Sequence, residues 1–146
     1  MKEALDRLAA AANRLNQASD RLTESIEILE DQFAKFGIGV PFWYGEDQMN
    51  FERYLVCVET KGASVTGWCL GYAKIDKRWR IAVKHVKVSD DTGKVIYKSE
   101  EPVPLASAPR AMRVLTIEHF PGLISAMTTK LEAYAADVEK SKTLLV

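Results

Sequence analysis

The sequence predicts an α+β fold, with a long N-terminal heptad helix, an antiparallel β-meander of four to five strands and two C-terminal helices. Three observations predict it. Apolar residues recur with a heptad period over residues 4–36, with a period of two over residues 40–98, and at alternating steps of three and four after Pro121. The 146 residues suffice for one domain, which we expect to divide into an oligomerising helix, residues 1–36, and an α+β body, residues 37–146.

Composition narrows the class of protein. Hydrophobic residues make up 47% of the chain, which is typical of a globular protein and too apolar for a disordered one. Basic and acidic residues number 20 each, which excludes histone-like and polyacidic proteins. No run approaches the ~18 apolar residues of a membrane-spanning helix, and the charged first residues do not form a secretory signal. We therefore expect a cytoplasmic protein with no membrane partner.

The heptad pattern is the strongest signal in the chain. No glycine or proline interrupts it, and Gly37 stands where a helix commonly ends. Its last two a and d positions are Phe33 and Phe36. The earlier ones are the predicted oligomer interface, Leu5, Leu8, Ala12, Leu15, Ser19, Leu22, Ile26 and Leu29.

Length turns this pattern into a prediction of self-association. Residues 4–36 would span roughly 50 Å at ~1.5 Å per residue. A compact domain of this chain length is only roughly 35–40 Å across. A second copy is the simplest cover for the excess apolar stripe, so we expect a homo-oligomer. The flanking positions are mostly small and uncharged, which favours an antiparallel pair or a bundle over a parallel dimer.

The sheet can be assigned a register from its turns. One turn is centred on Ala63 and the next on Asp76-Lys77, with a further turn at residues 90–93. The strand pairs that follow are Val58–Trp68, Val56–Leu70 and Tyr54–Tyr72 in the first hairpin, and Tyr72–Ile81, Leu70–Val83 and Trp68–His85 in the second. One face then becomes continuously apolar and aromatic, as a core covered by helices requires.

The other face is unusually flat. Its centre carries Gly67, Cys69, Gly71, Ala73 and Ala82, which predicts that a helix or a partner approaches closely there. The register sets Cys57 opposite Cys69, as a reduced pair or a disulfide, of which the reduced pair suits the cytoplasm. Up to Val83 the alternating apolar residues of the strand after Asp76-Lys77 have odd numbers, but beyond His85 they are Val86 and Val88. This change of alternation predicts a β-bulge at residues 84–86.

Prolines delimit the C-terminal helices. Ser107-Ala108-Pro109-Arg110 is typical of a helix start, and Pro121 breaks or kinks that helix. Beyond it, apolar residues step by three and four to form the stripe Ile124, Met127, Leu131, Tyr134, Val138 and Ser141.

Two surfaces could bind other molecules. The hairpin over residues 74–87 is basic, so it is a possible nucleic-acid surface through Lys74, Lys77, Arg78, Arg80, Lys84 and Lys87. The loop that begins Phe42-Trp43-Tyr44 and continues to Asp47 is either an exposed recognition loop for a protein partner or a plug in the core beside the helix end.

The sequence contains no recognisable catalytic motif. It lacks a phosphate-binding glycine loop, a nucleophile elbow and metal-ligand spacing, and His85 and His119 have no evident catalytic partners. We expect no cofactor and no metal. The sequence favours a non-enzymatic protein-interaction module, such as an adaptor, inhibitor or assembly protein, that self-associates through its first helix. The alternatives are nucleic-acid binding by the basic hairpin, and a ligand-binding protein or enzyme with a pocket under the aromatic sheet face.

Overall fold

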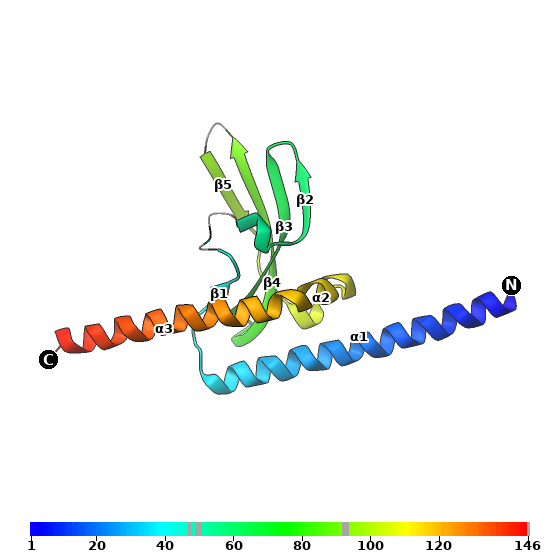
Figure 1. Ribbon diagram of the computed structural model, residues 1–146, viewed down its shortest axis with the longest axis horizontal. Helices are drawn as coiled ribbons and strands as arrows, with labels where there is room; N and C mark the ends of the chain where they lie inside the picture. The colour runs from blue at the N-terminus through cyan, green and yellow to red at the C-terminus, as the bar shows by residue number, and fades with distance from the viewer. Residues whose placement is uncertain (47, 49–50, 92–93, 146) are drawn as a thin grey trace.

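A computed structural model describes residues 1–46, 48, 51–91 and 94–145. It has the predicted α+β class, with the sheet standing on a layer of helices (Figure 1). In chain order the elements are α1 (Lys2–Phe36), β1 (Phe42–Trp43), the 3-10 turn η1 (Phe51–Tyr54), β2 (Val56–Lys61), β3 (Ser64–Ile75), β4 (Arg78–Asp91), β5 (Lys94–Ser99), β6 (Val103–Pro104), the 3-10 turn η2 (Leu105–Ser107), α2 (Arg110–Thr116), the 3-10 turn η3 (Ile117–His119) and α3 (Phe120–Leu144).

The first helix ends where the sequence predicts. Gly37 adopts the left-handed conformation, with φ 63° and ψ 39°, and its N–H donates to the Ala34 carbonyl. This is the geometry in which glycine carries no steric penalty. The helix is therefore continuous over the whole heptad pattern.

The central hairpin has the predicted register. In the antiparallel β3–β4 pair, Tyr72 lies opposite Ile81, Leu70 opposite Val83 and Trp68 opposite His85. Asp76 and Lys77 form its turn with φ values of 49° and 67°, as a tight two-residue hairpin turn requires. Around this hairpin, β1 and β2 pair with β3, and β5 and β6 pair with β4.

The first hairpin departs from its predicted register. Its turn is Gly62-Ala63, so Lys61 pairs with Ser64, and Val56 lies opposite Trp68 rather than Leu70. The register shifts between Val56 and Glu59, where Cys57 has a positive φ of 55°. Tyr54 belongs to η1 rather than to a strand. A bulge at Cys57 therefore displaces the pairing and separates Cys57, which is exposed, from the buried Cys69.

The predicted bulge at residues 84–86 is wrong. The β3–β4 pairing runs without a shift from Ser64↔Ser89 to Ile75↔Arg78. Along β4, the buried apolar residues switch from one face of the sheet to the other, because different parts of the chain cover the two faces at different positions along the strand. Val86 belongs to a second buried cluster with Phe51, Leu55 and Cys69, on the face opposite the main core.

The main core lies between the aromatic sheet face and the helices. Leu70, Tyr72, Ile81 and Val83 of the sheet are at most 1% exposed. They pack with side chains from α1, α2 and α3, namely Ile26, Phe33, Met112, Leu123 and Met127. The aromatic sheet face is thus covered by side chains from the chain's own helices.

The two C-terminal helices begin at the predicted prolines. Pro109 precedes the first residue of α2, and Pro121 lies in the first turn of α3, where a missing backbone N–H costs no helical hydrogen bond. The helices are separated only by the short turn η3.

The flat sheet face is approached closely, by the chain itself. A Cβ at Gly71 would lie 2.3 Å from the Phe42 carbonyl oxygen and 2.3 Å from the Trp43 ring, and a Cβ at Gly67 would lie 2.9 Å from the Leu55 Cβ. Gly71 thus leaves room for the Phe42 carbonyl and the Trp43 ring of the neighbouring strand β1, and Gly67 leaves room for Leu55, the residue after η1.

Replacing Gly71 with alanine tests this close approach. We expect Gly71→Ala to lower the free energy of unfolding by about 3 kcal/mol, because the new methyl group meets backbone that has no room to move. Gly62→Ala is the control, since its added Cβ meets nothing within 4 Å and costs only the strain of its φ of 58°, about 1 kcal/mol. Urea unfolding measures both. Equal losses would contradict the close approach.

Candidate functional site

The N-terminal half of α1 leaves the body. Every residue from 1 to 18 is exposed, and Figure 1 shows this end of the helix projecting beyond the sheet and the other helices. Leu5, Leu8 and Leu15 are 57%, 65% and 50% exposed. We call residues 2–18 the N-terminal arm. At ~1.5 Å per residue it extends for roughly 25 Å.

The second half of the same stripe is covered by the chain's own body. Ser19 is 5% exposed and Ile26 is 1% exposed, while Leu22 and Leu29 are partly buried against the main core. These four residues of the predicted oligomer interface therefore make contacts within one chain. Of the predicted set, Leu5, Leu8, Ala12 and Leu15 remain open to a second molecule.

A polar cluster marks the point where the arm leaves the body. The Ser19 hydroxyl accepts hydrogen bonds from Arg110 Nε and from Arg113 Nη2 of α2, both at 3.2 Å. Arg110 Nη2 also donates to Asn16 Oδ1 at 2.8 Å, and Arg113 Nη1 donates to the Thr23 hydroxyl. A serine at a heptad core position is thus explained by α2, which fixes α1 at this level.

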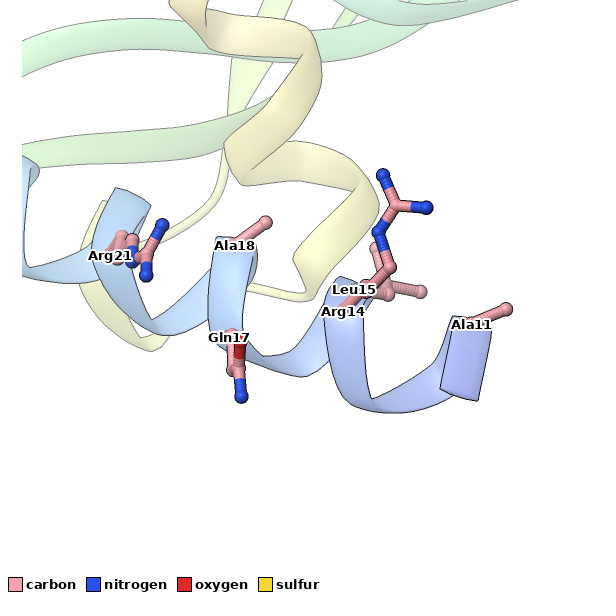
Figure 2. A pocket seen from close by; sticks show the side chains of 6 residues that line it. All are labelled: Ala11, Arg14, Leu15, Gln17, Ala18 and Arg21. Carbon is pink, nitrogen blue, oxygen red and sulfur yellow. The ribbon is translucent and has the colours of Figure 1, made fainter. Parts of the chain in front are cut away.

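An open hollow lies on α1 at this junction. All six residues that line it come from α1: Ala11, Arg14, Leu15, Gln17, Ala18 and Arg21. Figure 2 shows α2 passing beside this stretch, with Gln17 pointing away from it. Because one helix supplies the whole lining, the hollow is a surface of α1, across the end of the arm, and not an enclosed pocket.

Two basic side chains of the hairpin, Arg80 and Lys84, form ion pairs within the chain. Arg80 Nε donates to Glu30 Oε2 of α1 at 3.0 Å. Lys84 is 7% exposed, lies 4.2 Å from the Trp43 ring centroid and pairs with Glu46 at 3.9 Å. The predicted nucleic-acid surface therefore loses Arg80 and Lys84, and only Lys74, Lys77, Arg78 and Lys87 remain exposed.

Glu30 is a buried charged residue that sequence reasoning missed. It is 2% exposed, and its second oxygen accepts the Ile81 backbone N–H at 3.2 Å. Burial raises the pKa of this carboxyl above its ordinary value, although Arg80 and the Ile81 N–H act in the opposite direction. The residue ties α1 to the start of β4.

The aromatic loop is mainly a plug in the core. Phe42 is buried, and Trp43 and Tyr44 are half-buried. Tyr44 packs edge-on against Tyr54 at 4.9 Å between ring centroids, and the Trp43 ring lies over Gly71. Trp43 and Tyr44 form one wall of an open groove of about 580 Å³, and α3 forms the other with Ser125, Thr129 and Lys130.

The thiols and imidazoles show no shared site. Burial raises the pKa of Cys69 to about 12, which keeps this thiol protonated. His85 packs against Trp68 and lies 3.9 Å from Glu100, whereas His119 lies beside Tyr44 and Glu118. Among the described residues, no three His, Cys, Asp or Glu side chains gather as metal ligands would, and none of the described helices has the length and apolarity to cross a membrane.

Comparison with protein-family models, with curated proteins and with solved structures finds no match for this chain.

Two substitutions by alanine, at Ile26 and at Leu8 of the same stripe, test where the body ends. Ile26→Ala should lower the free energy of unfolding of the dilute protein by about 3 kcal/mol, because it empties a fully buried site. Leu8→Ala should change it by less than about 0.5 kcal/mol, because this side chain touches no part of the body. Urea unfolding compares the two. A comparable loss for Leu8→Ala would mean that the arm folds back onto its own chain.

The raised pKa of Glu30 predicts a pH dependence. A carboxyl whose pKa is higher in the folded than in the unfolded chain contributes stability at low pH, and this contribution declines as pH rises through the folded pKa. The unfolding free energy of the wild type, relative to Glu30→Gln, should therefore fall between pH 4 and pH 7. Urea unfolding of both proteins at each pH gives this difference. A difference that grows with pH would show that Arg80 outweighs burial.

Proposed function

We propose that the protein is a self-associating interaction module, in which the N-terminal arm binds another copy of the chain. One observation carries the proposal. The arm continues the heptad stripe that the body covers from Ser19 onward, yet its three leucines are half or more exposed. The same pattern thus serves the chain's own core in one half and is left open in the other.

Energetics favour a partner for the arm. Complete burial of one leucine contributes about 1.5–3 kcal/mol, so three leucines on one stripe amount to a substantial gain. A helix of this length is marginal in water by itself, and the arm is anchored at one end only, by the Ser19 cluster. Association would both bury the leucines and stabilise the helix.

Self-association would give each assembly at least two α+β bodies. Two linked bodies present any binding surface twice, which raises the apparent affinity for a protein partner that carries two sites. This is the role expected of an adaptor or assembly protein. The nucleic-acid alternative has less support, because Arg80 and Lys84 are engaged by Glu30, Glu46 and Trp43.

Charged substitutions on the arm test the proposal. In light scattering, the wild type should have a mass of at least twice the chain mass of 16.3 kDa. Leu8→Glu combined with Leu15→Glu should reduce it to the single-chain value at the same concentration, because a buried unpaired carboxylate opposes association.

The matched control lies on the opposite face of the same arm. Ala10→Glu combined with Gln17→Glu adds the same charge two positions further along the heptad and should leave the mass unchanged. A wild type that is a monomer at micromolar concentration, or a control that dissociates as fully as the leucine variant, would refute self-association through the stripe.

A further inference from the structure

We infer that the arm of one copy packs antiparallel against the C-terminal stripe of α3 in a second copy, and that the second arm does the same in return. The inference rests on the proposed self-association and specifies its surface. The C-terminal stripe is defined as Leu131, Tyr134, Val138 and Ser141, which all lie on one side of α3.

The C-terminal stripe is the second open apolar surface on a projecting helix. Residues 132–145 are all exposed, and Val138 is 67% exposed. The stripe continues an apolar groove of about 400 Å³ between the end of α1 and α3, which is lined by Phe33, Phe36, Ile124 and Leu131 among others. Phe36 is itself largely exposed at the end of α1. A helix laid on the stripe would thus cover the open ends of both helices.

The spacing of the two stripes matches in antiparallel orientation. On the arm the steps are three, four and three, and on α3 read backwards they are also three, four and three. One register therefore aligns every layer. It places Leu5 opposite Ser141, Leu8 opposite Val138, Ala12 opposite Tyr134 and Leu15 opposite Leu131.

Three of the four layers pair apolar or aromatic side chains, and the outermost layer sets Leu5 opposite Ser141. The smallest stripe residue of the arm, Ala12, lies opposite the largest residue of the C-terminal stripe, Tyr134. The summed side-chain volume of this layer is therefore close to that of a layer of two medium-sized apolar residues. Alanines at positions 4, 9 and 11 flank the arm stripe, so no like charges meet there and the helices can approach closely. Antiparallel helices also set opposite dipole ends side by side.

The placement of the two helices makes the contact reciprocal. Figure 1 shows the N-terminus of α1 and the C-terminus of α3 at opposite ends of the molecule, with both helices running in about the same direction. One chain therefore cannot bring its own arm to its own C-terminal stripe. A two-fold axis perpendicular to the helices reverses the direction of the second copy. Each arm then lies beside the other copy's α3, and the same contact forms twice, which gives a closed dimer.

This pairing uses more surface than the simplest alternative. Two arms packed against each other would align Leu5 with Leu15 and Leu8 with Ala12, but both C-terminal stripes would remain exposed. The reciprocal pairing covers all four open stripes and forms the same contact twice, which brings the buried area toward that of stable dimers.

Cysteine cross-linking distinguishes the two pairings in the full-length chain. Cys57 is first replaced with serine, because it is the exposed thiol, whereas Cys69 is buried and stays. In this background, Leu8→Cys with Val138→Cys should convert most of the protein to a covalent dimer under mild oxidation, as seen on a non-reducing gel. Leu8→Cys with Ala136→Cys, which places the second thiol on the opposite face of α3, should give only background.

The outcomes separate the inference from the proposed function. Cross-linking of Leu8→Cys with Ala12→Cys, but not with Val138→Cys, would overturn the reciprocal pairing while leaving self-association intact. A ladder of multimers would overturn the closed two-fold arrangement. A dimer in light scattering with no cross-link at Leu8 and Val138 would also refute the inference, whereas a monomeric parent chain would refute the proposed function itself.

Discussion

Burial of α1 from Ser19 to Phe33 against the sheet and α2 is the contact on which the rest of the structure depends. Ile26 and Phe33 supply the apolar part of this contact. Glu30 fixes the position of α1 along β4 through its bonds with Arg80 and the Ile81 N–H. Ser19, which accepts hydrogen bonds from two arginines of α2, marks the N-terminal end of the covered part of α1. Because these polar groups are buried, a sliding of α1 would leave them without partners, which costs far more than the bonds themselves contribute.

The same contact determines what is left open. A helix held over its second half carries its first half outward in a fixed direction, so the arm is positioned by the core although it touches none of it. The C-terminal half of α3 is carried outward in the same way, from the buried residues Leu123 and Met127. The two projecting helix ends therefore leave the body at opposite ends of the molecule (Figure 1).

Much of this fold follows from the sequence, and the exceptions have physical causes. The β3–β4 register was predictable because its polar turn and its alternation agree, and a slip would have exposed Leu70 and Ile81. The β2 register was not, because a left-handed residue at Cys57 has no signature in the hydrophobic pattern. The heptad predicted the length of α1 but not which leucines the body covers, since that depends on where η2 and α2 return along the chain.

Glu30 shows the same limit for charged residues. In the sequence it is one acid among several on the flank of a heptad, and its partner Arg80 lies fifty positions away. Only the placement of β4 under α1 makes the pair, and the raised pKa of the carboxyl follows from that burial. The open stripes differ in this respect, because their spacing is local to each helix and is legible in the sequence. The proposed pairing of Ala12 with Tyr134 needed the structure for one reason, which is to show that both side chains are exposed in their own chain.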